Sequence, residues 1–315
     1  MTLSPLFRRV SFDDVPGWAG DDHLPAFEAF RRSAFQSLKK PYKSGALGVG
    51  FEAFASAYAA SQAVEVADSS GARAFFEQFF VPALIEPESG KGFVTGFYEP
   101  EVQASSVRTK VFTVPLLSRP ADLVDVDDRN RPVGMDPYLA FARRLPNGTL
   151  AEYFDRGGIE RGALAGQGLE AAWLAEPVDA FFVHVQGAAR LNMTDGTTRR
   201  VTYAAKSGQR FSGPGRILAD LGEIPLEQVT MQSIRAWFRA HPERINEILW
   251  QNRSYIFFRD AEVDDRALGP VAAAKVPLTP GRSIAVDRLL HTFGTPFFID
   301  APKLTAFGGE PFRQL

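Results

Sequence analysis

The sequence has 315 residues, of which 45% are hydrophobic and 23% charged, and its formal net charge is −2. This composition is ordinary for a soluble globular protein of about two domains, and the near-neutral charge argues against a nucleic-acid binder or a protein adsorbed on a membrane surface. Cysteine is absent, which excludes disulfides, thiolate metal sites and a cysteine nucleophile in this chain.

Neither a membrane span nor a metal site is predicted. No apolar stretch approaches the roughly 20 residues that a membrane-spanning helix needs. Residues 1–9 also lack the apolar core of a signal peptide, so the sequence predicts either a cytoplasmic protein or an export signal outside this chain. The four histidines lie far apart and show no metal-ligand spacing.

The first ninety residues or so are predicted to be mainly helical. Asp21 or Asp22 is placed to cap a helix that ends near Leu38, with apolar residues recurring on one face. Phenylalanine-rich patterns predict two further helices at residues 51–63 and 71–80. These helices precede a strand-like stretch.

The middle third is predicted to be rich in strands, and the last third is mixed. Strand patterns occur at residues 111–117, 181–185, 199–203, 255–258, 283–286 and 295–299. Helical patterns occur at residues 170–174, 217–221, 226–240 and 242–250. Asp195-Gly196 predicts a hairpin. An order of strand, long excursion and strand again suggests that one domain is inserted into another.

The stretch 91–105 combines strand-forming residues with a hydroxyl, a phenol and a carboxylate. These three groups belong to Thr95, Tyr98 and Glu99. A sugar is held by such a surface, with ring faces on aromatic side chains and hydroxyls on short polar groups. The alternative is an edge strand that ends in a tyrosine, and the motif by itself does not decide between the two.

Two segments are similar to sequence elements of one family, the membrane-bound lytic murein transglycosylase A family. Residues 95–100 match its Thr-Gly-aromatic-Tyr-Glu-Pro element. Residues 182–190 resemble its Val-Gln-Gly-Ser-Gly-Arg segment, with Ala188 and Ala189 in place of the serine and the second glycine.

A third segment extends the resemblance toward the end of the chain. Residues 254–259, followed by 284–288, look like the front half of the family's three-aspartate domain, with Asp287 as the first aspartate. Each motif alone is weak, whereas the order and spacing of the three are specific. The resemblance runs from about Pro82 to the end.

The resemblance implies cleavage, without water, of the β-1,4 bond between N-acetylmuramic acid and N-acetylglucosamine, which leaves a 1,6-anhydro ring. Because the muramyl 6-hydroxyl is the nucleophile, one carboxyl of raised pKa serves as acid and then as base. No metal or organic cofactor is implied. The family's catalytic aspartate lies in an Asp-x-Gly-x-Ala-Ile element that is expected beyond Leu315, and the chain, if complete, is expected to be inactive.

Carried onto this sequence, the family match gives substrate-binding roles to Thr95, Tyr98, Glu99, Gln186 and Asp287. Thr95 and Tyr98 are expected to contact the glycan rather than only to pack in a strand. Glu99 either bonds a sugar hydroxyl or caps a turn, and Gln186 either binds an acetamido group or makes ordinary strand-end hydrogen bonds. Asp287 is expected to shape the barrel or line the groove rather than to transfer the proton.

The basic residues near these motifs are interpreted as solvated surface charges rather than as ligands of peptide carboxylates. They are Arg190, Lys206 and Arg288.

The fold implied by the resemblance is mainly β with helices. Residues 1–100 and 246–315 are expected to form a double-psi β-barrel domain, interrupted by an inserted second β-barrel-like domain at residues 101–245, with glycan strands in the groove between them. The expected partner is the peptidoglycan glycan strand, not nucleic acid, and the expected state is a monomer. The expected location is periplasmic in a Gram-negative bacterium, or outer-membrane associated through a segment absent from this chain.

Two other functions stay open at this point. One is a non-catalytic glycan-binding or scaffold protein of the cell envelope on the same fold. The other is a cellulose-directed barrel of the endoglucanase or expansin type.

Overall fold

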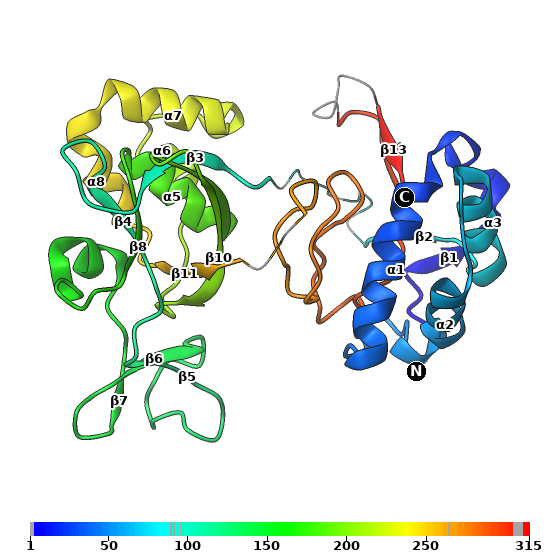
Figure 1. Cartoon of the computed structure of the whole chain (residues 1–315), viewed down its shortest axis with the longest axis horizontal. Coiled ribbons are helices and arrows are strands. Elements are labelled where there is room, and N and C mark those ends of the chain that lie inside the picture. The colour runs from blue at the N-terminus through cyan, green and yellow to red at the C-terminus, as the bar shows by residue number, and fades with distance from the viewer. Residues whose placement is uncertain are drawn as a thin grey trace. The chain divides into compact units, whose positions relative to one another are not determined.

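The computed structural model describes residues 3–88, 90, 92, 94, 96, 98–261, 263, 265–304 and 311–315, and its fold is mixed α/β. The chain divides into two compact units (Figure 1). Unit 1 comprises Met1–Phe97 and Val263–Leu315, and unit 2 comprises Tyr98–Glu262. Among the described residues, no helix is both long and apolar enough to span a membrane.

Unit 1 is built on three helices that pack around an aromatic core. They are α1 (His23–Lys39), α2 (Ala55–Ala63) and α3 (Ser69–Phe79). The core consists largely of buried rings, among them Phe27, Phe30, Tyr58, Phe75 and Phe76. The side chain of Asp22 caps α1 by accepting a hydrogen bond from the backbone N–H of Leu24. The three predicted helices of this region are therefore confirmed.

The described strands of unit 1 are short and form two antiparallel pairs. They are β1 (Phe7–Arg9) with β2 (Ala83–Ile85), and β12 (Ile299–Ala301) with β13 (Phe312–Gln314). The strand predicted at 283–286 is wrong, because that segment forms no ladder. The segment begins with a turn instead, in which the backbone N–H of Thr279 donates to the hydroxyl of Ser283. The strand predicted at 295–299 shares only Ile299 with β12.

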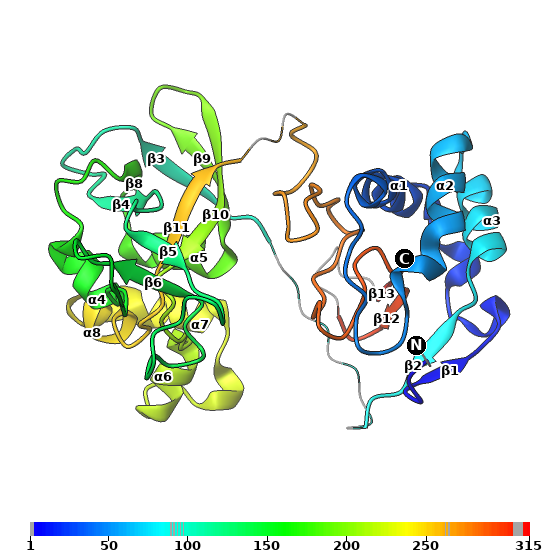
Figure 2. The ribbon, with the colours of Figure 1, turned by 90° about the horizontal axis from the view of Figure 1, so that it is seen from below.

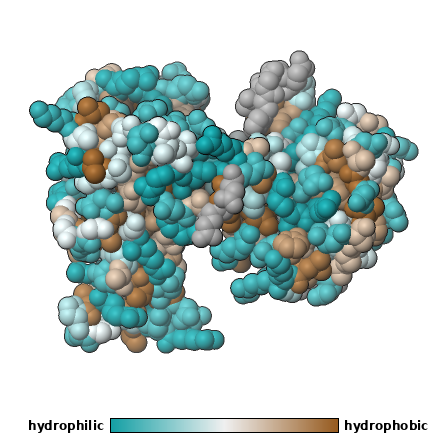
Figure 3. Space-filling model, viewed as in Figure 1, coloured by the Kyte–Doolittle hydropathy of each residue, from teal (hydrophilic) through white to brown (hydrophobic). Residues whose placement is uncertain are grey.

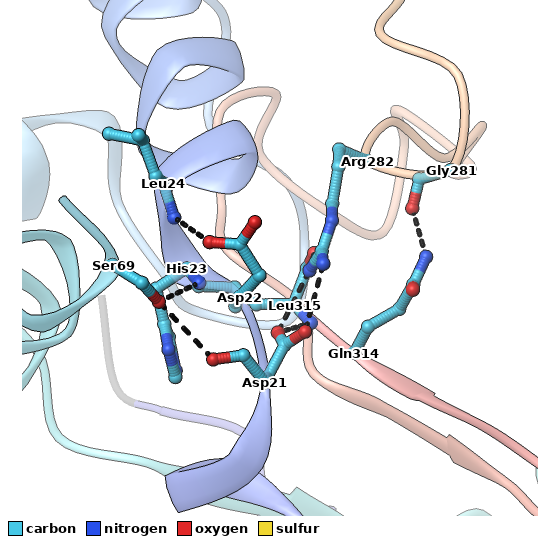
Figure 4. Close-up of polar contacts among 9 residues, drawn as sticks. All are labelled: Asp21, Asp22, His23, Leu24, Ser69, Gly281, Arg282, Gln314 and Leu315. Atoms are coloured by element: carbon cyan, nitrogen blue, oxygen red, sulfur yellow. Dashed lines mark hydrogen bonds and ion pairs between the residues drawn. The ribbon is translucent and has the colours of Figure 1, made fainter.

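A buried ion pair fastens the start of α1 to the far end of the sequence within unit 1 (Figure 4). The Arg282 guanidinium donates two hydrogen bonds to the Asp21 carboxylate, at 2.8 and 2.9 Å, and both side chains are buried. The backbone of Leu315 completes the arrangement, because its N–H donates to Asp21 and its carbonyl accepts from Arg282. Segments nearly 300 residues apart in sequence are therefore locked together.

Unit 2 contains a six-stranded sheet (Figure 2). Its strands, in spatial order, are β11 (Ile256–Asp260), β10 (Thr198–Lys206), β9 (Ala188–Met193), β3 (Glu101–Ser105), β8 (Glu170–Leu174) and β4 (Val114–Leu117). β3 and β9 pair in parallel, and the other neighbours pair antiparallel. The sequence predicts an inserted domain that ends at residue 245, whereas unit 2 runs to Glu262 because β11 is hydrogen-bonded to β10.

The predicted hairpin at Asp195-Gly196 is confirmed as the connection between β9 and β10. Gly196 takes a left-handed backbone with φ of 84°, which glycine adopts without steric cost. The Asp195 carboxylate accepts from both the backbone N–H and the hydroxyl of Thr197, at 2.9 and 2.6 Å. The turn thus fixes the register of the two strands.

One predicted strand is a helix in the structure, and one predicted helix is a strand. Residues 181–185 belong to a helix, α5 (Pro177–Gln186), and the strand prediction there is wrong. Pro177 starts the helix and Gly187, with φ of 72°, ends it. The helix is buried on both sides, against the sheet and against other helices, so its sequence shows no polar face to mark a helical period. Residues 170–174, predicted as helical, are strand β8, which lies between β3 and β4.

The remaining elements of unit 2 surround this sheet. The helices are α4 (Arg156–Gly158), α6 (Pro214–Asp220), α7 (Met231–Ala240) and α8 (Ile245–Leu249). A separate small sheet consists of β5 (Leu123–Asp125), β6 (Phe141–Arg144) and β7 (Leu150–Ala151) (Figure 1). Single helical turns lie at Phe12–Asp14, Trp18–Gly20, Phe51–Phe54, Ile159–Ala163, Leu226–Gln228 and Pro242–Arg244. On the face shown in Figure 3, apolar residues lie scattered among polar ones.

Candidate functional site

Of the first motif, residues 95–100, the structure describes Gly96 and the residues from Tyr98 onward. Thr95 is one of the residues that the structure does not describe, so its predicted glycan contact stays a prediction. Tyr98 is 40% exposed, and its hydroxyl contacts the Met231 sulfur at 3.2 Å. Its ring is therefore tethered at one end and accessible to a ligand.

The carboxylate of Glu99 is ion-paired with two arginines. It accepts from Arg190 Nε at 2.8 Å and from Arg200 at 2.7 and 3.2 Å. Glu99 and Arg200 are each only 8% exposed, and Arg190 is 23% exposed. The carboxylate thus holds the backbone beside Tyr98 against β9 and β10. Arg190, predicted to be a solvated surface charge, is instead ion-paired and partly buried.

Strand pairing brings the first two motifs together although ninety residues separate them. In the parallel ladder between β3 and β9, Glu101 lies opposite Arg190, and the backbone N–H of Arg190 donates to the carbonyl of Pro100 at 2.8 Å. Gln186 ends α5 just before β9 starts. It is partly exposed, and within the described part of the chain no side-chain hydrogen bond to it is present. Its amide is therefore available to a ligand.

Asp287 lies in unit 1, whereas Tyr98, Glu99 and Gln186 lie in unit 2. Asp287 is exposed, and its carboxylate accepts from the backbone N–H of Leu289 at 2.8 Å. Its carbonyl also accepts from the N–H groups of Leu290 and His291. Asp287 therefore organises a tight turn, and its predicted role toward the glycan stays a prediction.

A cavity of about 430 Å³ opens beside Tyr98 within unit 2. Its apolar lining includes Val102 of β3 and Leu174 of β8. Charged groups also line it, namely Glu101, Glu176, Asp179 and Arg235. Arg235 donates to the Asp179 carboxylate at 2.6 Å, and its guanidinium lies 4.5 Å from the Phe182 ring centre. The volume falls in the range of small-ligand sites.

A buried arginine, Arg156, connects three segments of unit 2. Its guanidinium donates to His184 Nδ1 at 3.0 Å, to the carbonyl of Ser254 at 2.8 Å and to Glu160 at 2.9 Å. Because Nδ1 accepts, His184 is a neutral imidazole with its proton on Nε2. Burial, and then the Arg156 charge, hold the pKa of His184 well below its usual range. The cluster fixes α5 two residues before Gln186.

The sequence interpretation missed Arg200 and Arg156. For Arg200 a signal exists, because the Asp195-Gly196 hairpin register places it directly opposite Arg190. Two like charges in a cross-strand pair are unfavourable without a counter-ion, and Glu99 supplies one. For Arg156 only Glu160, four residues later, could have been a signal, since His184 and Ser254 come from distant parts of the sequence. Within the described part, no group of histidine, aspartate and glutamate side chains could hold a metal ion.

Comparison with known proteins decides the family. Residues 93–259, more than half of the chain, match the family model described as the MltA specific insert domain. The chain belongs to the membrane-bound lytic murein transglycosylase A family. The range that matches this family model nearly coincides with unit 2. The family prediction made from the three sequence segments is therefore confirmed.

Several relatives are similar over much of the chain. The membrane-bound lytic murein transglycosylase A of Vibrio cholerae is 29% identical over 70% of this chain and 52% of its own length. That of Escherichia coli K12 is 30% identical over 67% of this chain and 49% of its own length. The chain thus spans about half the length of the curated relatives it matches.

Solved structures agree with this assignment. The crystal structure of a membrane-bound lytic murein transglycosylase from Agrobacterium tumefaciens is 47% identical, with a TM-score of 0.90, covering 98% of this chain and 84% of that chain. MltA from Neisseria gonorrhoeae is 29% identical, with a TM-score of 0.78, covering 98% of this chain and 81% of that chain.

Proposed function

We propose that this protein acts on the glycan strands of peptidoglycan as a lytic transglycosylase. The supporting observation is that the two family motifs meet in unit 2, where Glu99 of the first is ion-paired to Arg190 of the second. Membership of a family whose relatives are named lytic murein transglycosylases agrees with this proposal. The proposed bond is the β-1,4 link between N-acetylmuramic acid and N-acetylglucosamine.

Three residues of unit 2 have distinct roles in this proposal. Tyr98 offers a ring face to a sugar, because it is accessible and held by its contact with Met231. Gln186 offers an amide that can both donate to and accept from an acetamido group. Glu99 positions the first motif through its two arginines rather than binding a sugar hydroxyl itself. We also propose that Thr95 and Asp287 contact the glycan, as predicted from the sequence.

The proposed reaction is an intramolecular displacement. The bond from C1 of the muramyl residue to the bridging O4 breaks, a bond from O6 to C1 forms, and the proton lost from O6 balances the one gained by O4. One carboxyl can deliver the first proton and accept the second if its pKa is raised toward neutrality.

None of the carboxyl groups whose pKa is shifted in the described part suits this role. In each of them a hydrogen bond is the largest cause, and it lowers the pKa. They are Asp14, Glu77, Asp136, Asp195, Glu223 and Glu247. We therefore assign the proton transfer to none of these six groups. Non-catalytic glycan binding on the same fold is the second candidate function.

The finer fold and the location belong to this proposal as well. A double-psi β-barrel interrupted by a second barrel-like domain is the arrangement that the family resemblance implies. The six-stranded sheet of unit 2 is compatible with the second of these domains, and the described strands of unit 1 form only two short pairs. A location in the periplasm or at the outer membrane is part of the proposal, and the naming of the relatives as membrane-bound agrees with it.

Digestion of purified murein sacculi tests the proposed reaction. Mass spectrometry of the soluble products is expected to show 1,6-anhydromuramyl ends. Reducing muramic ends would indicate a hydrolase and contradict the proposal. Glycan binding without any release of products would support the non-catalytic candidate.

A further inference from the structure

The cavity beside Tyr98 carries more negative charge than its single arginine can balance. Three carboxylates line it, those of Glu101, Glu176 and Asp179, against the one guanidinium of Arg235, so the lining has a formal charge of −2. Arg235 is paired with Asp179 at 2.6 Å. The excess charge therefore resides on Glu101 and Glu176.

These two glutamates have weak or no ionic partners among the described residues. Glu101 reaches only Arg190, at 3.9 Å, and Arg190 is already held at 2.8 Å by Glu99. Glu176 stands at the N-cap position of α5, yet its side chain makes no capping hydrogen bond. Two carboxylates thus border a cavity without strong counter-ions of their own.

The rest of the lining favours an aliphatic chain that ends in a cation. Val102 and the exposed Tyr98 ring supply apolar surface, and the ring can also attract a cation to its face. A neutral sugar would use neither the excess charge nor the apolar surface fully. An ammonium group on a short aliphatic stem uses both.

We propose that this cavity binds the amine of a diamino acid in the peptide attached to the glycan. This inference rests on the proposed function, since it takes the glycan to lie against Tyr98 at the cavity mouth. A sugar on the Tyr98 ring then leaves its peptide branch free to enter the cavity. Glu101 and Glu176 are thereby specificity-determining residues that bind the peptide, while Tyr98 binds the sugar.

Calorimetric titration with three ligands tests the inference. The first is a disaccharide-peptide whose diamino acid has a free amine, the second is the same compound acetylated on that amine, and the third is chitohexaose. The wild-type chain is expected to prefer the free amine over the acetylated form by about fivefold, the upper end of what one exposed charge pair contributes. Raising the ionic strength should reduce this preference, because exposed charges are screened.

The double substitution Glu101→Gln with Glu176→Gln is expected to reduce the preference to about twofold or less, because the carboxylates that attract the amine are gone. Its affinity for chitohexaose should be unchanged, which also shows that the variant is folded. The matched control is Asp220→Asn on α6, whose carboxylate pairs with Arg216 at the surface and does not line the cavity. This control should keep the full preference.

Two results would overturn the inference. The first is a wild-type chain that binds both disaccharide-peptides equally, and the second is a preference that survives the double substitution. In either case intact chitohexaose binding would leave the proposed function standing. Failure of the wild-type chain to bind any of the three ligands would remove the proposed function, and this inference with it.

Discussion

The ion-paired Glu99 gives the sharpest test of how the first motif is held. Glu99→Gln keeps the shape of the side chain but removes its charge, so that Arg200, only 8% exposed, loses its ion pair with Glu99. Breaking a buried pair typically costs about 3–5 kcal/mol. We expect about 3 kcal/mol here, because Arg190 is 23% exposed and water can solvate part of its charge.

Unit 2 must be measured by itself, because a two-domain chain need not unfold in one step. Hydrogen exchange followed by mass spectrometry on peptides from residues 188–206, at increasing urea concentration, reports the opening free energy of β9 and β10. The matched control is Asp220→Asn, which breaks a pair with Arg216 of the same 2.8 Å length but with 70% and 59% exposed side chains. This control should cost at most about 1 kcal/mol.

A loss of under about 1 kcal/mol for Glu99→Gln, equal to the control, would refute the reasoning, since it would place the pair among solvated surface contacts. A double-mutant cycle with Arg200→Met makes the test independent of either single variant. The coupling free energy should be about 1 kcal/mol or more, because removing both charges avoids the uncompensated arginine. Zero coupling would contradict the proposed contact.

Three further predictions follow from single side chains. Tyr98→Ala should weaken chitohexaose binding by about 1–3 kcal/mol in calorimetry without unfolding the chain. The control Tyr138→Ala, at an equally exposed tyrosine, should leave the binding unchanged. Equal losses of binding free energy in the two variants would remove Tyr98 from the site. Burial lowers the pKa of His184 in the folded state, so as the pH falls the unfolded chain binds a proton before the folded chain does. Unit 2 should therefore lose stability from about pH 6.5 downward, by up to about 1.4 kcal/mol per pH unit. His184→Asn should abolish this slope, and an unchanged slope in the variant would contradict the prediction. In unit 1, Asp21→Asn should cost about 3–5 kcal/mol in urea unfolding and the exposed Asp300→Asn less than about 1, and similar values would count against the buried pair.

Local chemistry in the sequence was enough to predict several elements. The Asp195-Gly196 turn and the Asp22 cap are decided by residues within a few positions of each other, and both appear in the structure. Helices α1 and α3 of unit 1 also have one clear apolar face each. Such features depend little on what the element packs against.

Features that depend on tertiary packing could not be predicted in the same way. Helix α5 is buried on two sides, so its apolar run at 181–185 has no periodicity that separates helix from strand. Arg190 is brought to Glu99 by the parallel pairing of β3 with β9, which joins segments ninety residues apart, and Arg200 by the antiparallel pairing of β10 with β9. Glu99 and Arg190 were recognisable from the sequence as motif residues, whereas the ion pair between them was not.

The central claim is that the first and second motifs form one glycan-binding surface in unit 2. A titration of the isotope-labelled chain with chitohexaose, followed by nuclear magnetic resonance, tests it directly. The claim predicts that resonances of Tyr98 and Gln186 shift together at one dissociation constant while those of Tyr138 stay in place. Shifts confined to the region of Tyr138, or no shift at Tyr98 and Gln186 at saturating ligand, would contradict it.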